Sequence, residues 1–283
     1  MFERRPNDLK ILLQNNLLDT EFDWLLKTIE ETQLQATSRK LYLNYSLCGS
    51  RIQDEVLDDC DAVASDLRDY LKIQKASKKE IARIYLLCSV LSESSIFEEW
   101  VKKLIQVADT SELATFLKFL VLLPSPENYL FVAAEALRTN ISVVFDAISK
   151  YNPYPATYFS EQQWNQMFLK AAFMQQDLGA IVAIENRANV ELARIISDYA
   201  HERWAASRAV DPMIWRPVSK FLNDDLFEDI KILLGSENIK EKQAGALICF
   251  HSDFGFAKDF LNTYPELKSS IESGKITWDS IND

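Results

Sequence analysis

Apolar residues recur at spacings of three and four positions along nearly the whole chain, and no segment sustains the two-residue alternation of a half-buried strand. This pattern predicts amphipathic helices separated by short polar breaks. The fold class predicted from it is all-α. The predicted helices cover residues 8–15, 20–32, 38–48, 59–75, 78–92, 95–108, 111–122, 126–137, 141–150, 161–175, 190–208, 212–222, 224–234, 239–251 and 256–263.

The end of the chain predicts helices arranged in antiparallel pairs. Residues 224–234 and 239–251 form one pair around a short polar break, and residues 256–263 begin another. The small side chains of Ala244 and Ala246 let one helix approach its neighbour closely. Such pairs bury their apolar faces only against adjacent pairs, so the pattern is typical of a HEAT-like α-solenoid. We therefore expect stacked antiparallel helix pairs.

Composition agrees with one large helical domain. The chain has 283 residues, of which 48% are hydrophobic, which is enough for a sizeable core. It contains only 6 Gly and 8 Pro, whereas β-sandwiches and loop-rich α/β enzymes use glycine freely at turns. No linker-like composition marks a boundary. The expected domain covers residues 1–283, with generic helices over 1–110, a specialised central region over 111–222 and HEAT-like helix pairs over 223–283.

Charge and cysteine usage exclude several classes of function. With 42 acidic and 31 basic residues, the net charge of −11 repels phosphate backbones, and no basic patch offsets it. We therefore predict no nucleic-acid partner. Cys48, Cys60, Cys88 and Cys249 are scattered without a CxxC pair, which predicts reduced thiols that act as small apolar residues.

No segment predicts export or membrane insertion. The first eight residues lack the long apolar core of a signal peptide. The most apolar run, residues 113–123, is short and contains Lys118, so it predicts a buried helix and not a membrane span. We expect a cytoplasmic protein with no transmembrane segment.

The helix predicted over residues 190–208 carries an unusual polar face. Glu191, Arg194 and Asp198 fall on one side of it at ion-pairing spacing. One interpretation is a solvated ladder of salt bridges, which adds little stability per pair. The other is that this face lines a groove in which Arg194 and Asp198 recognise a ligand.

The end of this helix favours the second interpretation more than the face alone does. His201, Glu202, Arg203 and Trp204 follow one another there. Trp204 combines a large apolar surface with one hydrogen-bond donor, beside an arginine able to stack or to bind in a bidentate manner. Asp198 and His201, three positions apart, could also form an oriented acid–base pair, although the sequence names no nucleophile near them.

Asn165 lies within the apolar arc of the helix predicted over 161–175, beside Trp164. A side-chain amide in that position must be hydrogen-bonded, or it costs roughly 1–3 kcal/mol. Asn165 is therefore either a structural amide that ties down a neighbouring loop, for which the segment 152–155 is one candidate, or a ligand contact.

Two further segments supply candidate binding residues. The two prolines of Asn152-Pro-Tyr-Pro155 predict a stiff, extended connector that places Tyr154 over a pocket or only joins two helices. Arg138 is expected near a helix C-terminus, a favourable position for a cation, and Asn140 is expected to cap the next helix.

The sequence contains no familiar catalytic or metal-binding motif. Its two histidines, His201 and His251, have no metal-ligand partner at a useful spacing, so we predict no metal site. There is no HExxH, Walker A, GxGxxG or GxSxG pattern. The catalytic residues, if any, stay unknown, and no cofactor is predicted.

Five ordered motifs in the central region resemble the EboA-domain family of bacterial proteins. They are Arg138-Thr-Asn-Ile-Ser-Val-Val-Phe-Asp-Ala-Ile148 with Asn152-Pro-Tyr-Pro-Ala-Thr-Tyr-Phe159, Trp164-Asn-Gln-Met-Phe-Leu-Lys-Ala171, Arg187-Ala-Asn-Val-Glu-Leu-Ala193, Asp198-Tyr-Ala-His-Glu-Arg-Trp-Ala-Ala206 and Trp215-Arg-Pro217. The resemblance is strong in the centre and weak over the N-terminal third. Lys150-Tyr151 stands where the family pattern suggests an arginine.

The resemblance implies a context more than a reaction. Genes of this family lie in bacterial clusters for the biosynthesis or export of secondary metabolites, beside a membrane prenyltransferase, a sugar-phosphate-cyclase-like enzyme, a TatD-like hydrolase and a sugar-isomerase-like protein. It implies as partners a small-molecule pathway intermediate and enzymes of the same cluster, including the prenyltransferase. It supplies no catalytic residues.

Two functions follow as hypotheses. The first is a helical-repeat binding or scaffold protein whose central groove holds a pathway intermediate or a partner enzyme. The second is a cofactor-independent enzyme that acts on a prenylated or cyclitol-like intermediate. The low glycine content and the missing nucleophile favour the first. The candidate ligand-binding residues are Arg138, Asn140, Asn152, Tyr154, Trp164, Asn165, Arg187, Asn189, Arg194, Asp198, His201, Glu202, Arg203 and Trp204.

Overall fold

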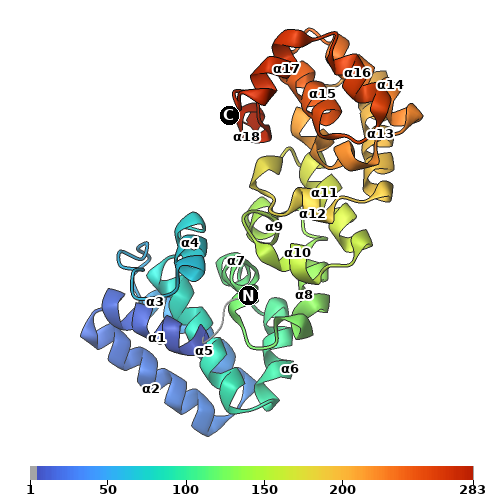
Figure 1. Cartoon of the computed structure of the whole chain (residues 1–283). Helices are drawn as coiled ribbons and strands as arrows, with labels where there is room; N and C mark the ends of the chain where they lie inside the picture. The colour runs from blue at the N-terminus through green and yellow to red at the C-terminus, as the bar shows by residue number, and fades with distance from the viewer. Residues whose placement is uncertain (1–4, 283) are drawn as a thin grey trace. The chain divides into compact units, whose positions relative to one another are not determined.

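The structure, a computed structural model, describes residues 5–282, and the elements of regular secondary structure in this part are helices. Figure 1 shows the succession of helices. No strand occurs among these residues, and the only β-type pairing within them is an isolated bridge between Val56 and Ser77. The all-α prediction is confirmed. The chain divides into two compact units, one ending at Tyr158 and the other beginning at Phe159.

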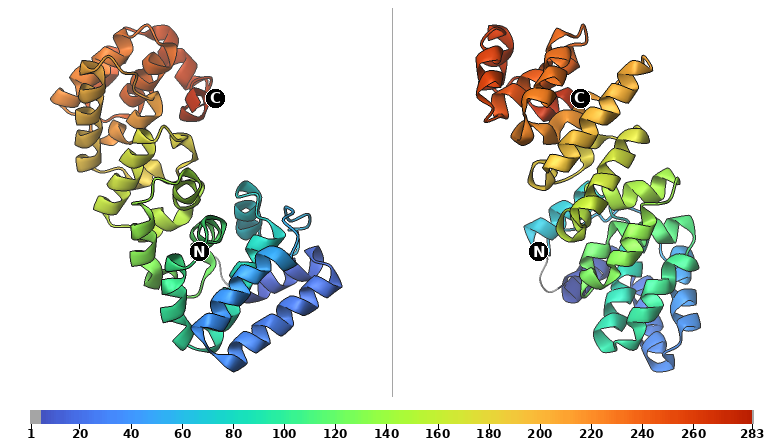
Figure 2. Two further views of the ribbon diagram at one scale, coloured as in Figure 1. Left: turned by 180° about the vertical axis from the view of Figure 1, so that it is seen from behind. Right: turned by 90° about the vertical axis from the view of Figure 1, so that its right-hand side faces the viewer.

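The first unit is built around one largely buried helix, α5 (Lys78–Glu93). Nearly every residue of α5 from Ile81 to Cys88 is buried, and α1, α2 and α3, blue in Figure 2, pack against it. The other helical segments of this unit are α1 (Arg5–Asn16), α2 (Asp19–Gln35), α3 (Ser38–Arg51), α4 (Ser65–Ile73), α6 (Ile96–Lys103), α7 (Thr110–Lys118), α8 (Leu130–Ala136), α9 (Ser142–Ser149), α10 (Pro153–Tyr158) and the 3-10 turns η1 (Leu104–Gln106), η2 (Leu120–Leu122) and η3 (Pro126–Tyr129).

The second unit is organised around α15 (Ile239–His251), which packs against α14, α16, α17, α18 and η5. Ala244, Gly245 and Ala246 are all buried, and a Cβ on Gly245 would lie 3.0 Å from Cγ of Leu234 on α14. The close approach predicted for this face is confirmed. The remaining helical segments are α11 (Glu161–Phe173), η4 (Leu178–Ala180), α12 (Ile184–Arg187), α13 (Val190–Ala205), η5 (Pro212–Phe221), α14 (Asp224–Gly235), α16 (Gly255–Leu261), α17 (Pro265–Glu272) and α18 (Trp278–Asn282).

Three local predictions were wrong, two of them because of proline. The expected extended connector is the short helix α10, because Pro153 and Pro155 occupy its first turn, where no amide proton is needed. Residues 59–64 are not helical, and α4 begins only at Ser65. The segment Pro212–Phe221 is a 3-10 helix that contains Pro217 in its interior, a residue unable to donate a backbone hydrogen bond.

Two residues that stand directly before a predicted helix, Ser160 and Asn223, are N-caps in the structure. Ser160 accepts a hydrogen bond from the Gln163 amide and caps α11, and Asn223 accepts one from the Leu226 amide and caps α14. Helix α9, by contrast, begins after Ile141, so Asn140 does not cap it, and the hydroxyl of Thr139 accepts from the Ile141 amide.

A buried ion pair lies in the core of the first unit. Arg83 on α5 and Glu112 on α7 are 3% and 5% exposed, and Arg83 Nη2 lies 3.6 Å from Glu112 Oε1. Arg83 Nε donates to the carbonyl of Tyr45, and the Tyr45 hydroxyl donates to the carbonyl of Glu112 at 2.8 Å. Arg83 Nη1 has no hydrogen-bond partner among the described residues. Each charge therefore depends on the other for compensation.

The four cysteines are buried and none of them forms a disulfide, as predicted. Within residues 5–282, no helix has both the length and the apolar character needed to cross a membrane. Residues 1–4, on which the expectation about a signal peptide partly rests, lie outside the described part of the chain.

Candidate functional site

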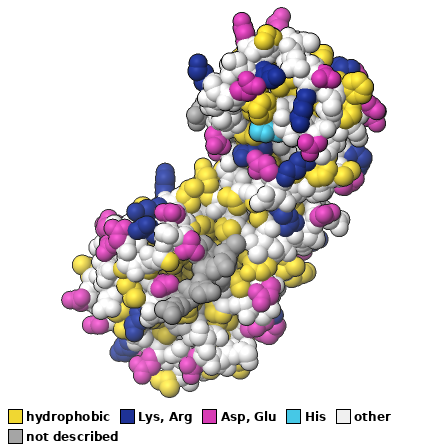
Figure 3. Space-filling model, viewed as in Figure 1, with side chains coloured by type: hydrophobic (Ala, Val, Ile, Leu, Met, Phe, Trp, Pro, Cys, Tyr) yellow, Lys and Arg dark blue, Asp and Glu magenta, His cyan; other side chains and the backbone are white. Residues whose placement is uncertain are grey.

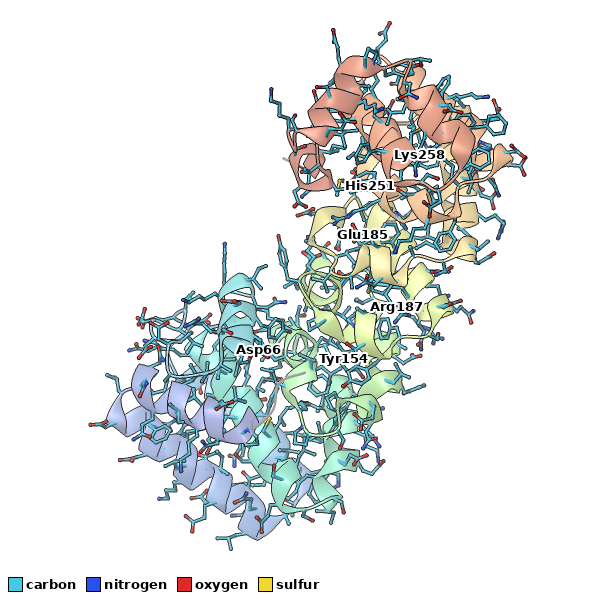
Figure 4. All side chains as sticks on the ribbon, in the orientation of Figure 1. Asp66, Tyr154, Glu185, Arg187, His251 and Lys258 are labelled. Carbon is cyan, nitrogen blue, oxygen red and sulfur yellow. The ribbon has the colours of Figure 1, made fainter. Side chains whose placement is uncertain are left out.

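Four of the candidate binding residues meet where α11, α12 and α13 converge in the second unit. The side-chain amides of Asn165 and Asn189 exchange two hydrogen bonds, of 3.1 and 2.9 Å. The guanidinium of Arg187, a residue labelled in Figure 4, lies 5.2 Å from the ring centroid of Trp164. Motifs that are separate in the sequence thus form one cluster.

This cluster fixes the backbone around the start of α13. Asn189 Oδ1 also accepts from the Leu192 amide at 2.8 Å, which makes Asn189 the N-cap of α13. Arg187 Nη2 donates to the carbonyl of Phe159 at 2.6 Å. Burial lowers the pKa of Arg187, an effect that nearby Glu161 opposes. The partner of Asn165 is therefore the Asn189 cap, and not the segment 152–155.

The indole Nε1 of Trp164 is buried and has no hydrogen-bond partner among the described residues. Trp164 itself is 1% exposed and lies under the Arg187 guanidinium. Trp164 is therefore a large core side chain in cation–π contact with Arg187, and little of its surface is left for a ligand in this conformation.

Asn152 and Tyr154 perform a similar backbone-fixing task in the first unit. The Asn152 side chain donates to the carbonyls of Leu117 and Ala147 and accepts from the amide of Tyr154. The Tyr154 hydroxyl donates to the carbonyl of Pro126 at 2.8 Å, and the residue, labelled in Figure 4, is fully buried. These two side chains connect α7, η3, α9 and α10.

The polar face of α13 forms the expected ladder of exposed ion pairs. Arg194 contacts Glu191 at 2.7 Å and Asp198 at 2.5 Å, and all three side chains are more than half exposed. Hydrogen bonds to Glu191 and the charge of Asp198 raise the pKa of Arg194. Ion pairs of this exposure contribute little to stability because water screens them.

We accordingly expect Arg194→Ala to leave the urea midpoint of the protein unchanged within error. The variant therefore separates the two interpretations of this face. If its helical circular dichroism and its stability match those of the wild type while ligand binding is lost, Arg194 is a recognition group. A clear drop in the midpoint would show that the ladder is structural after all.

His201 and Trp204 are held by residues that the sequence did not bring together. His201 Nε2 lies 2.6 Å from Oδ1 of Asp229, a buried carboxylate on α14 whose Oδ2 accepts from the Ser197 hydroxyl at 2.6 Å. Asp198 is bonded to Arg194, so the conceivable Asp198–His201 pair is not formed. Trp204 stacks on the buried Trp215, with ring centroids 5.9 Å apart.

Three further candidates are exposed residues. Arg138 is 80% exposed at its side chain and pairs with Glu135. Asn140 and Glu202 are both exposed. Whether any of the fourteen candidates touches a ligand stays a prediction.

One candidate, Arg203, borders a cleft of about 430 Å³ in the second unit, which we name the α13–α15 cleft. Arg203 Nε and Nη2 both donate to the carbonyl of Ala209, and its guanidinium lies 6.0 Å from the ring of Tyr199. These hydrogen bonds connect the end of α13 to the loop that follows it, and Ala209 and Val210 of this loop line the cleft. The lining residues are Ala172, Gln175, Tyr199, Arg203, Ala209, Val210, Asp211, Pro212, Met213, Ile214, Asn238, Lys240, Ile281 and Asn282.

The α13–α15 cleft combines apolar walls with opposite charges. Asp211 accepts from the Met213 amide at 2.9 Å and caps η5. Although Asp211 as a residue is exposed, desolvation raises the pKa of its carboxyl, while the Met213 amide and the charge of Lys240 oppose this rise. The Lys240 ammonium makes no ion pair or hydrogen bond to the described residues. It is available to an outside group.

Most lining residues of the α13–α15 cleft were absent from the sequence-based candidates. Gln175 lies in the turn after α11, Lys240 in α15 and Asn282 at the end of α18, and all three occur in ordinary polar surroundings in the sequence. Only Arg203 carried a signal, the density of aromatic and charged residues at the end of α13. Within the described part of the chain, no group of three or more His, Cys, Asp or Glu side chains is placed to hold a metal ion.

Comparison with known proteins gives one match. The family model described as metabolite traffic protein EboA matches residues 6–219. The match begins near the start of the chain, so it includes the N-terminal third, where the motifs showed hardly any resemblance. Neither the comparison with curated proteins nor that with solved structures gave a match. Since the matched residues make up well over half of its 283 residues, the chain belongs to the EboA family, whose model is described as a metabolite traffic protein.

Proposed function

We propose that the chain is a helical binding protein of metabolite traffic and that the α13–α15 cleft holds the metabolite. The observation that carries this proposal is the cleft itself. Its volume of about 430 Å³ lies within the range of about 300–1,000 Å³ that is usual for small-molecule sites. Its lining combines apolar side chains with a few polar groups, which is the usual composition of such sites.

The polar groups favour a ligand with both donor and acceptor groups. Lys240 offers an unused cation, and the carboxyl of Asp211, whose pKa desolvation raises, offers an acceptor. The ring of Tyr199 and the side chains of Val210 and Ile214 supply apolar contact. A polar cyclic intermediate, rather than a long hydrocarbon chain, fits this distribution.

The finer architecture and context belong to the same proposal. Helix α15 packs against α14, α16 and α17, which supports a HEAT-like stack of helix pairs in this unit. Membership of the EboA family supports a role beside the enzymes of a bacterial secondary-metabolite cluster. Scaffolding of such enzymes is the competing function of the same class.

Native mass spectrometry with solvent extraction tests this proposal, on protein purified from cells that also express the genes of its cluster. We expect a bound small molecule in the wild type and its loss in Ala209→Trp, because the added indole fills the cleft from an exposed loop position. Ala206→Trp is the matched control, since Ala206 is an exposed residue that does not line the cleft.

Each other outcome has a defined meaning. A ligand retained by Ala209→Trp would place binding elsewhere and contradict the proposal. A protein that carries no small molecule but co-purifies with an enzyme of the cluster would favour the scaffold. Equal helical circular dichroism of both tryptophan variants is required for either conclusion.

A further inference from the structure

A second, smaller cleft in the second unit is lined by residues of η5 within the range 216–220 and by residues of neighbouring segments, and we name it the α12–α15 cleft. Its volume is about 210 Å³, and it is lined by Glu185, Ala188, Arg216, Pro217, Ser219, Lys220, His251 and Trp278. Figure 4 labels Glu185 on α12 and His251 at the end of α15, two residues of this lining. None of the lining residues was among the sequence-based candidates.

Basic groups dominate this cleft, although the chain as a whole is acidic. Arg216 and Lys220 face a single carboxylate, Glu185, and the net charge of the chain is −11. Figure 3 shows dark-blue and magenta side chains interspersed on the visible face of the molecule. The two cations of the lining attract a small anion into the cleft, although Asp279, which does not line it, lies 3.9 Å from Arg216 Nη1.

The one carboxylate is already used to orient the arginine. Glu185 Oε1 lies 2.5 Å from Arg216 Nε, and the Arg216 side chain is 18% exposed. Its terminal nitrogens make no hydrogen bond to the described residues, and Nη1 comes no closer than 3.9 Å to an oxygen of Asp279, a side chain almost fully exposed. A guanidinium fixed through Nε presents its Nη atoms to an oxyanion.

Further donors in the lining lack protein partners. The Ser219 hydroxyl makes no hydrogen bond to the described residues, although the residue is only 7% exposed. The ring nitrogens of His251 likewise make no hydrogen bond to the described residues, and the ring lies 5.2 Å from that of Phe250 in a T-shaped arrangement. Both donors are therefore open to a ligand atom in the cleft.

Apolar surface completes the site. Trp278 is 8% exposed and lines the cleft together with Pro217 and Ala188. The volume is below the range of about 300–1,000 Å³ that is usual for drug-sized ligands, so the cleft accommodates one small ring at most.

From this arrangement we infer that the α12–α15 cleft is a binding site for a small oxyanion, a carboxylate or a phosphate, attached to a compact ring. Arg216, Lys220 and His251 surround the anion, the Ser219 hydroxyl donates to it, and the ring packs on Trp278. The site is separate from the α13–α15 cleft, so its failure would leave the proposed metabolite site untouched.

The two histidines make this inference directly measurable by NMR. The imidazole resonances of His251 and His201, assigned with His251→Asn, are followed at constant pH while benzoate, inorganic phosphate or benzyl alcohol is added. We expect saturable shifts of the His251 resonances with benzoate and, more weakly, with phosphate. Benzyl alcohol, which has the ring without the charge, should produce none. His201, which does not line the cleft, is the internal control.

Three variants refine the test. Lys220→Met is expected to weaken benzoate binding roughly tenfold, because one charge-assisted contact is lost. Lys231→Met, which removes an exposed lysine of α14 outside the cleft, should leave binding unchanged. Ser219→Ala should weaken binding without lowering Tm, since it deletes a hydroxyl that makes no hydrogen bond to the described residues.

Several results would overturn the inference. The first is an absence of saturable shifts with either anion. The second is equal, non-saturating movement of both histidines, which would indicate a bulk ionic effect. Shifts as large with benzyl alcohol as with benzoate, or unchanged binding in Lys220→Met and Ser219→Ala, would also exclude an oxyanion site here.

Discussion

Replacing Glu112 with glutamine is expected to lower the free energy of unfolding by about 3–5 kcal/mol, the usual cost of removing one partner of a buried ion pair. Glutamine keeps the shape of the side chain and can still accept from the Asp109 amide, as Glu112 Oε2 does at 3.0 Å. What it removes is the negative charge opposite Arg83, which is 3% exposed and already has one terminal nitrogen without a partner. Urea denaturation measures the loss.

A double variant controls for the pairing itself. Arg83→Met combined with Glu112→Gln leaves no uncompensated charge in the core, so the double variant should be more stable than Glu112→Gln alone. Additive effects of the two single changes would show that the ion pair is not the cause. A loss below about 1 kcal/mol for Glu112→Gln would mean that water reaches Arg83 in the folded protein.

The second large effect is expected from Asn189→Ala, at about 2–4 kcal/mol of unfolding free energy. The substitution removes the N-cap of α13 and leaves the amide of Asn165, which is 5% exposed, without its reciprocal partner. Chemical denaturation again gives the value. The change should also weaken the attachment of α12, because Asn189 Nδ2 donates to the carbonyl of Arg187.

Asn223→Ala provides a matched comparison. Asn223 caps α14 through the Leu226 amide, but it is exposed and makes no further side-chain bond to the described residues. Its loss should cost about 1 kcal/mol, the usual value for an N-cap. The difference between the two variants is the contribution of the Asn165–Asn189 pair. Equal losses would reduce Asn189 to an ordinary cap.

The asparagines of the central region change the interpretation of the sequence motifs. Asn152, Asn165 and Asn189 all use their side chains to satisfy backbone groups or one another. A polar residue within an apolar pattern must find such a partner, and a ligand is only one of the possible partners. Many of the Asn, Arg and Trp side chains in the centre of the chain therefore hold α11, α12 and α13 together. Ligand recognition by the same residues is a separate hypothesis.

The sequence by itself determined the helical class, most helix positions and several caps. Apolar spacing and caps such as Ser160 and Asn223 act between residues at most four positions apart, so they can be recognised in a short window. The same locality explains the error at Pro153–Tyr158. The two prolines predicted an extended backbone, but proline is also accepted in the first turn of a helix, and a short window does not distinguish the two.

Only the tertiary structure decided which polar groups meet. Asp229 joins Ser197 and His201 across two helices, and neither contact has a local signal. The two clefts are assembled from the ends of helices, with Gln175 and Asn282 in one and Glu185 and His251 in the other. Periodicity specifies which face of a helix is buried. The packing of many helices against one another decides where buried faces leave a space, and which distant charges line it.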